Sequence, residues 1–242
     1  MKNLFQLYLD NPARTKQPVN LVKNASEASL YIYDIISSDW GVSAMQVIDA
    51  IAQVGDAKTL NVYINSPGGE VFESRAIMAA LERFPGKTVA HIDGLAASCA
   101  TSIALACNQV NMSQGALFMI HNATSMAWGD KTAMREAADL LEKTELLVIK
   151  DYTDKTGKSD VEIAMRMDAE TWFTADEALA NGFIDNVVEA KAKTKNTWNL
   201  AAYKNAPPPD PEPIPKIIPE PAPEAGFFMS VANENRLRAT QI

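Results

Sequence analysis

Residues 87–106 read KTVAHIDGLAASCATSIALA and contain two patterns in one short stretch. Residues 87–93 favour a β-strand, and the residues after Ser98 follow an apolar helical pattern. Ser98 is therefore expected at a strand-to-helix turn, beside the unpaired backbone N–H groups that begin a helix. This position suits a nucleophile whose attack creates an oxyanion, although an ordinary serine N-cap is the commoner use of serine at such a place.

The flanking sequence alternates between strand and helix patterns. Ser43 with Gln46, and Thr174 with Glu177, form capping boxes that mark two helix starts. The expected strands are 29–36, 58–64, 87–93, 109–112, 116–121 and 183–188, and a long helical region is expected at 130–156. This alternation predicts an α/β fold with a largely parallel sheet and flanking helices.

A second turn contains two adjacent glycines. The expected strand 58–64 is followed by the sequence NSPGG, which ends in Gly68 and Gly69. Two glycines after a proline can adopt backbone conformations that are closed to other residues, with exposed N–H groups. Ligands of α/β folds bind at the carboxyl ends of the strands, where this turn and the Ser98 turn both fall.

Composition argues against several classes of function. The chain has 242 residues, 47% of them hydrophobic, which is enough for one sizeable packed domain. Its net charge of −8, without a basic cluster, argues against a nucleic-acid-binding surface. No apolar run reaches the roughly 18 residues that span a bilayer, and the start lacks a signal-peptide pattern. We therefore expect an intracellular, cytoplasmic protein that binds neither nucleic acid nor membrane.

The two cysteines, Cys99 and Cys107, fall on the same expected helix. Eight helical residues separate them by about 12 Å, which is too far for a disulfide. We expect both to be small core residues. With two histidines and no paired metal-ligand spacing, the sequence predicts neither a zinc site nor another cofactor.

The composition changes at both ends of the chain. Residues 1–28 are polar and contain two prolines, so we expect a poorly packed arm before the main body at 29–192. Nine of the thirteen prolines lie between residues 207 and 223 among acidic residues, which is typical of an extended linker, assigned to 193–225. Residues 226–242 fit a docking peptide or a flexible terminus, and we favour the second.

A serine nucleophile needs a base, and the chain has only His91 and His121. His91 lies on the expected strand seven residues before Ser98 and should be distant from its hydroxyl. His121 ends an apolar strand and opens a loop, so it could reach a site at a strand end; it could equally be a half-buried structural histidine. Asp168 and Glu170, which precede an aromatic pair, are the most suggestive candidates for an acid that orients the imidazole.

Four motifs in register resemble the ClpP-type serine peptidases. They are YINSPGG (63–69), GLAAS (94–98), MIHN (119–122) and TADEA (174–178). Their order and spacing agree with that family over about residues 29–190. The chain resembles most its phage-type members, the ClpP-like head maturation proteases, through MDAETW (167–172) and the Pro-rich tail. The resemblance implies a ClpP/crotonase-like fold with a long helical "handle" region.

The resemblance also implies a role for particular residues of a serine endopeptidase. Ser98 matches the nucleophile and His121 the general base. The backbone N–H groups of Gly69 and Cys99 match the oxyanion hole, and Gly68 belongs to the same substrate-binding turn. No cofactor or metal is implied.

The acid of the implied triad departs from the family pattern. Its position falls on Glu170, where an aspartate is usual. Asp168 is the alternative, because it lies two residues away on the same side of what we expect to be an extended chain. We favour Glu170 on register.

The resemblance implies an assembly as well as an activity. ClpP-type subunits form rings, commonly stacked heptamers, and the helix at 130–156 would contribute to ring-to-ring contacts. The implied partners are protein or peptide substrates, with capsid proteins or a Clp-type ATPase as further candidates. Residues 1–28 do not match the family's N-terminal segment closely, which leaves coupling to an ATPase open.

Several alternatives stay open at this point. A Ser–Lys pair could use Lys131 or Lys150, although the histidine motif favours His121, and Cys99 is a weaker candidate nucleophile. A housekeeping-like proteolytic subunit of an ATP-dependent Clp protease is the alternative physiological role. Further alternatives are a crotonase-like acyl-CoA enzyme and a catalytically inactive assembly protein.

Overall fold

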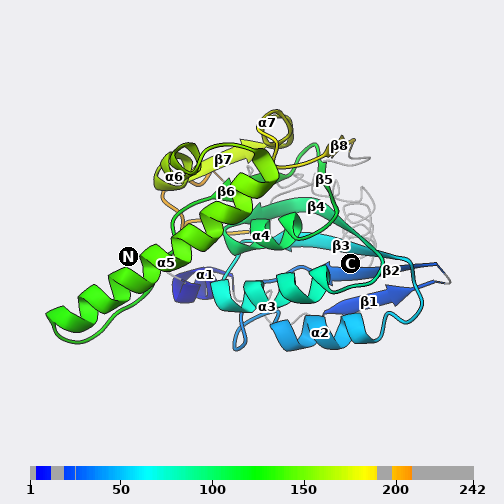
Figure 1. Cartoon of the computed structure of the whole chain (residues 1–242), viewed down its shortest axis with the longest axis horizontal. Helices are drawn as coiled ribbons and strands as arrows, with labels where there is room; N and C mark the ends of the chain where they lie inside the picture. Colours follow the sequence, from blue (N-terminus) through cyan, green and yellow to red (C-terminus); the bar gives the residue numbers. More distant parts are fainter. Residues whose placement is uncertain (1–3, 12–18, 25, 190–197, 209–242) are drawn as a thin grey trace, which may run out of the picture. The chain divides into compact units, whose positions relative to one another are not determined.

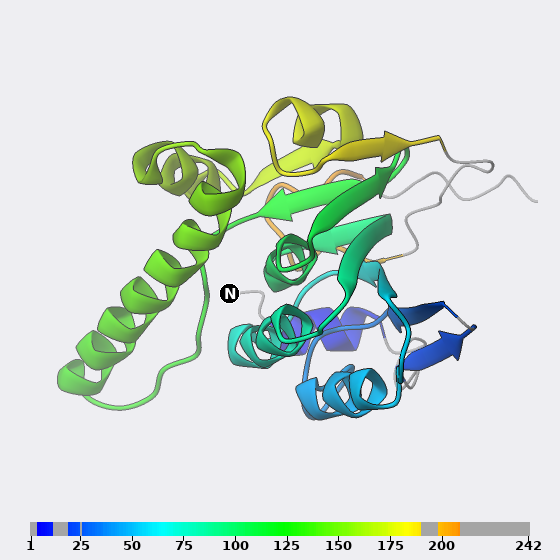
Figure 2. The same cartoon turned by 45° about the vertical axis from the view of Figure 1, so that its right-hand side comes forward.

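The computed structural model describes residues 4–11, 19–24, 26–189 and 198–208. These residues all belong to one compact unit, residues 1–210, which is shown in Figures 1 and 2. The second unit, residues 211–242, lies outside the described residues, as does most of the expected linker. The domain boundaries therefore stay predictions.

The described strands form one sheet in the order β1-β2-β3-β4-β5-β8, with β6 pairing to β4 and β7. Their bounds are β1 Asn20–Lys23, β2 Glu27–Ile32, β3 Thr59–Ser66, β4 Lys87–Ala97, β5 Gln109–Ser113, β6 Leu117–Ile120, β7 Thr171–Thr174 and β8 Asn186–Val188. Only β1–β2 and β6–β7, among the pairings of these strands, are antiparallel. The predicted α/β fold with a mostly parallel sheet is confirmed.

The helices are α1 Leu4–Asp10, α2 Ala44–Ala52, α3 Val71–Glu82, α4 Cys99–Leu105, α5 Lys131–Thr156, α6 Asp160–Asp168 and α7 Ala175–Ala180. Both predicted capping boxes are present, at Ser43 for α2 and at Thr174 for α7. The long α5 begins at the N-cap Asp130 and ends at Gly157, whose φ of 70° suits glycine. These caps fix the helix ends where the sequence places them.

Strand β4 is longer than the sequence pattern indicates, and the extra length positions the Ser98 turn. Residues 89–92 of β4 pair with β5, whereas residues 95–97 pair with β6. The strand therefore continues past the expected end at Asp93, through Gly94, because a second neighbour takes over its hydrogen bonds. Ser98 follows directly from the part that β6 holds.

The sheet is packed on both faces, because alternate β4 residues enter two apolar clusters. Ile92 and Ala96 belong to the larger cluster with residues of α2, α3 and α4, which lie together on one face in Figure 1. Leu95 and Ala97 belong to a smaller cluster on the other face, with Leu7 of α1 and residues of 198–206. Leu7 is only 3% exposed, so α1 is better packed than the polar composition of residues 1–28 suggests, whereas β1 in the same range is largely exposed.

Helix α5 extends beyond the rest of the unit in Figure 1. Its buried residues Thr144, Val148 and Tyr152 all lie in its second half. The first half, together with the loop before it, leaves large apolar side chains exposed, including Met126 at 73% and Trp128 at 99%.

Within the described ranges, none of the helices combines the length and the apolarity needed to cross a membrane.

Candidate active site

Ser98 occupies a strained backbone conformation between β4 and α4. Its φ of 54° and ψ of −132° lie where residues other than glycine are rare, at a cost of about 1–3 kcal/mol. The conformation is held on both sides: the Ser98 N–H donates to Met119 O at 2.9 Å, and Ser98 O accepts from Thr101 N–H at 3.0 Å. Although Ser98 stands at the N-cap position of α4, its side chain makes no capping hydrogen bond.

The Ser98 hydroxyl instead faces His121, whose Nε2 lies 2.9 Å from Ser98 Oγ. His121 directly follows β6, and the parallel register of Ala97 with Met119 brings the ends of β4 and β6 to the same edge. Burial lowers the pKa of His121 below its ordinary value, and the negative charge of Glu170 partly opposes this effect. A neutral imidazole at this distance can accept the hydroxyl proton.

The other histidine takes no part in this arrangement. His91 lies in β4, where its ring stacks on Tyr63 with centroids 4.7 Å apart and Nε2 lies 3.1 Å from Asn61 Oδ1. Both lysines of the Ser–Lys alternative lie on helix α5. Lys131 begins α5, and Lys150 pairs with Asp154 on the exposed surface of the same helix.

The two glycines of the second turn lie against the Ser98 turn. Both have positive φ, 91° at Gly68 and 155° at Gly69. A Cβ atom on Gly68 would come within 2.7 Å of Ser98 Cβ and 3.3 Å of the Cys99 backbone nitrogen. A Cβ on Gly69 would lie 1.9 Å from Ile36 O, so only glycine fits there. The backbones of Gly68 and Cys99 therefore meet next to the serine.

Cys99 is buried, with 4% of its surface exposed. Burial raises the pKa of its thiol to about 12, so the thiol stays protonated near neutral pH. Cys107 is also buried, and both cysteines are free. The sequence prediction that they are core residues is confirmed, and the side chain of Cys99 is unsuited to act as a nucleophile.

The two candidate acids have different surroundings. Glu170 lines the same pocket as Ser98 and His121, and its charge acts on the imidazole. Asp168 accepts a hydrogen bond from Asn122 Nδ2 at 2.7 Å. The expectation that the two carboxylates share one side of an extended chain is wrong, because Asp168 is the last residue of α6 and Glu170 has a φ of 47° in the turn after it.

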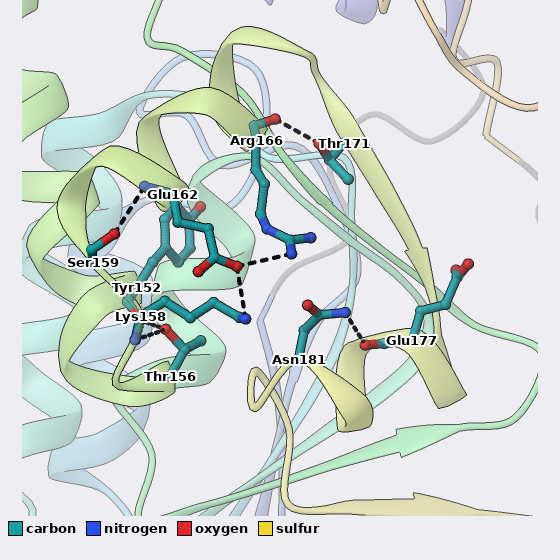
Figure 3. Close-up of polar contacts among 9 residues, drawn as sticks. All are labelled: Tyr152, Thr156, Lys158, Ser159, Glu162, Arg166, Thr171, Glu177 and Asn181. Atoms are coloured by element: carbon teal, nitrogen blue, oxygen red, sulfur yellow. Dashed lines mark hydrogen bonds and ion pairs between the residues drawn. The ribbon is translucent and has the colours of Figure 1, made fainter.

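Glu170 is held by a turn that α6 and β7 fix from both ends. The Thr171 hydroxyl donates to Arg166 O at 2.7 Å, which ties the start of β7 to the last turn of α6. Figure 3 shows that Arg166 and Lys158 both donate to the Glu162 carboxylate, at 3.0 and 2.8 Å. The bond from Thr171 spans the turn that contains Glu170, whereas the ion pairs of Glu162 lie within α6 and just before it.

Residues 202–204 form part of the site, although they fall within the linker predicted from composition. The Glu170 carboxylate accepts hydrogen bonds from the backbone N–H groups of Lys204 and Asn205 and from Trp172 Nε1. Tyr203 lies edge-on to the His121 ring, with centroids 5.3 Å apart. The aromatic and apolar run WNLAAY (198–203), which interrupts a polar tail, was the available signal.

These residues surround one cavity of about 910 Å³. Its walls come from the Gly69 turn, residues 123–126, the first half of α5 and residues 202–204, with Ser98 and His121 also lining it. Within the described part of the chain, no group of three histidine, cysteine, aspartate or glutamate side chains could hold a metal ion. The arrangement supplies a hydroxyl, a base and a carboxylate beside an open cavity.

Comparison with known proteins identifies the family. The profile of the Clp protease family matches residues 15–191. This chain belongs to the Clp protease family. The resemblance predicted from the sequence motifs is thereby confirmed at the level of the Clp protease family.

Individual relatives agree with this assignment. The ATP-dependent Clp protease proteolytic subunit of Streptococcus pyogenes serotype M5 is 31% identical over 138 residues, covering 55% of this chain and 70% of the relative. The corresponding subunit of Streptococcus suis is 32% identical over 136 residues, covering 54% and 69%. A solved structure of a ClpP1 point mutant from Listeria monocytogenes matches with a TM-score of 0.61 at 19% identity, over 67% of this chain and 92% of that one. This last comparison shows the shared fold.

Proposed function

We propose that this chain is a serine endopeptidase in which Ser98 is the nucleophile, His121 the general base and Glu170 the acid. The hydrogen bond of 2.9 Å between Ser98 Oγ and His121 Nε2 carries the proposal. It places a hydroxyl and a neutral base in direct contact at the edge of an open cavity. The family membership, and the relatives named as proteolytic subunits, support the same chemistry.

The proposed reaction is acyl transfer to Ser98 followed by hydrolysis. His121 Nε2 takes the hydroxyl proton as Ser98 Oγ attacks the peptide carbonyl carbon. The N–H groups of Gly69 and Cys99 stabilise the oxyanion that forms. When the intermediate collapses, the peptide C–N bond breaks and the proton passes from His121 to the leaving amine. Water, activated in the same way, then releases the acyl group from Ser98.

Ser98→Ala is the first test, with hydrolysis of an unfolded protein or a fluorogenic peptide library as the readout. We expect the variant to lose hydrolysis, whereas the matched control Ser26→Ala, on an exposed turn, keeps the wild-type rate. Wild-type hydrolysis by Ser98→Ala would contradict the proposal. Thioester turnover that does not depend on Ser98 would instead favour an acyl-CoA enzyme.

The proposal includes assembly into a homo-oligomeric ring, with heptamers or stacked heptamers as the expected form. Its support is the exposed apolar surface around α5, which includes Met126, Trp128, Leu140, Leu146 and Leu147. Large exposed apolar patches mark interaction surfaces, and all five residues lie on α5 or in the loop before it. Light scattering after size-exclusion chromatography should give a multiple of the subunit mass, and Leu147→Asp should reduce it. A wild-type monomer at micromolar concentration would contradict this part of the proposal.

The physiological role has two candidates within the same chemistry. The sequence MDAETW (167–172) and the Pro-rich tail favour a cytoplasmic head maturation protease that acts on capsid proteins. The naming of the relatives as ATP-dependent proteolytic subunits favours a housekeeping-like role with a Clp-type ATPase. We favour head maturation. Site-specific cleavage of co-encoded capsid proteins without ATP would support it, and hydrolysis of folded proteins only with a Clp-type ATPase would support the other role.

A further inference from the structure

Residues 198–206 form a strap that is anchored to the body of the molecule. Trp198 is 3% exposed, and its Nε1 donates to Asn65 Oδ1 at 3.1 Å. Asn199 and Asn11 exchange two hydrogen bonds, of 2.8 and 3.0 Å. Because Trp198 also packs in the smaller apolar cluster, the start of the strap has a defined position against the sheet.

The C-terminal end of the strap binds the Glu170 carboxylate through hydrogen bonds. The backbone N–H of Asn205 donates to Glu170 Oε1 at 2.6 Å, and that of Lys204 donates to Oε2 at 3.0 Å. The side chain of Asn205 also donates to Ala169 O at 2.8 Å. Both carboxylate oxygens are thus fixed by main-chain donors. A glutamate side chain has one more rotatable bond than an aspartate side chain. The two hydrogen bonds therefore restrict rotations that would otherwise move the Glu170 carboxylate.

Between its two ends, the strap touches the base. The edge-on contact of Tyr203 with the His121 ring limits the tilt of the imidazole. Its hydroxyl donates to Pro67 O at 2.5 Å, next to the two glycines. The indole of Trp172, which also donates to Glu170, packs against the Tyr203 ring with centroids 5.8 Å apart. The Tyr203 side chain therefore contacts the His121 ring, the turn that contains the two glycines, and Trp172, which donates to Glu170.

The strap borders the cavity without filling it. Ser98 and His121 keep their hydrogen bond, and a cavity of about 910 Å³ lies beside them with Tyr203 in one wall. The strap therefore leaves the contact between the base and the nucleophile intact. We infer that the strap is a positioning element of the catalytic site, which holds the Glu170 carboxylate and the His121 ring in their working orientation. This inference rests on the proposed peptidase function.

The test removes the backbone N–H of Asn205, and a control variant removes only the Asn205 side chain. Asn205→Pro deletes the N–H that Glu170 Oε1 accepts, whereas Asn205→Ala keeps it and loses only the bond to Ala169. The readout is the rate of Ser98 labelling by a fluorophosphonate, separated into the maximal rate and the half-saturating concentration. We expect Asn205→Pro to lower the maximal rate by about 10- to 100-fold, as for loss of a hydrogen bond to a charged group, with little change in half-saturation. Asn205→Ala, which keeps this N–H, should lower the maximal rate less than Asn205→Pro does.

A double mutant separates positioning from general loss of structure. If the strap acts through Glu170, adding Asn205→Pro to Glu170→Ala should cause little further loss. Tyr203→Ala gives a second route, with Tyr203→Phe as the conservative variant that keeps the ring against His121 and restores most of the rate. This pair tests the strap even where Asn205→Pro does not fold.

Three results would overturn the inference. They are equal labelling rates for Asn205→Pro and Asn205→Ala, faster labelling in Asn205→Pro or Tyr203→Ala, and independent losses in the double mutant. Faster labelling would mean that the strap inhibits the site. Failure of the proposed function itself gives a different pattern, because then Ser98→Ala would hydrolyse peptides as well as wild type does.

Discussion

The nucleophile and the base are positioned in one way, and the acid is positioned in another. Ser98 and His121 directly follow two strands, β4 and β6, whose parallel register of Ala97 with Met119 sets their separation. Glu170 lies in the turn after α6, and its carboxylate is held by residues 204–205, more than thirty positions further along the chain. The pair is fixed by the sheet, whereas the acid depends on a contact between distant segments. Substitutions should therefore affect the two parts differently.

The largest effect is expected at the base. His121→Ala should lower kcat/KM by about 1,000-fold or more, because it removes the imidazole that lies 2.9 Å from Ser98 Oγ as its base. Peptide hydrolysis is the measurement. The matched control is His91→Ala, whose ring stacks on Tyr63 away from the serine, and it should keep activity. Equal losses in the two variants would contradict the assignment of His121.

A smaller effect is expected at the acid. Glu170→Gln should lower kcat by about 10- to 100-fold, because the neutral amide stabilises the imidazolium less than the carboxylate does. Asp168→Asn should have little effect on kcat, since Asp168 bonds to Asn122. The reverse ranking of the two variants in peptide hydrolysis would assign the acid role to Asp168.

The pH dependence of kcat/KM should show the influence of Glu170 on His121. The imidazole acts as a base only when it is neutral, so activity is lost as the pH falls through its pKa. Burial lowers this pKa below the ordinary 6.5, so the acid limb of wild type should lie below pH 6.5. Glu170 raises the pKa, and Glu170→Gln should therefore move the acid limb to lower pH. An unchanged acid limb would show that Glu170 does not act on the imidazole.

The Ser98–His121 pair could be predicted from the sequence more fully than the position of Glu170 could. The Ser98 turn and the His121 strand end are local patterns of strand, turn and helix, and the parallel sheet then brings strand ends together. The position of Glu170 depends on the end of α6 and on a left-handed residue, neither of which has a strong local signal. The extended-chain expectation at residues 168–170 was wrong for this reason.

The strap was missed because its partners are distant in sequence. Residues 198–206 precede a Pro-rich tract, and composition alone assigned them to a linker. Trp198, Leu200 and Tyr203 are apolar enough to pack. They pack in the smaller apolar cluster with residues of α1, β4 and β6, which are distant from them in the sequence. Likewise, the length of β4 depends on β6, which follows it in the chain. Local patterns carry no information about such pairings.

The smallest effect is expected at Cys99. Cys99→Ser keeps the backbone N–H and removes only a buried thiol whose pKa is raised to about 12. Peptide hydrolysis should therefore stay within about threefold of wild type, apart from a modest loss of stability. Abolished activity in a folded Cys99→Ser variant would show that the thiol has a chemical role.

The most direct measurement is the site and rate of fluorophosphonate labelling, followed by peptide mass spectrometry. The contact of 2.9 Å with His121 predicts a covalent adduct on Ser98 in wild type and labelling slower by about 100-fold or more in His121→Ala. Adduct formation on another residue, or equal labelling of Ser98 in both proteins, would contradict an active site in which His121 activates Ser98.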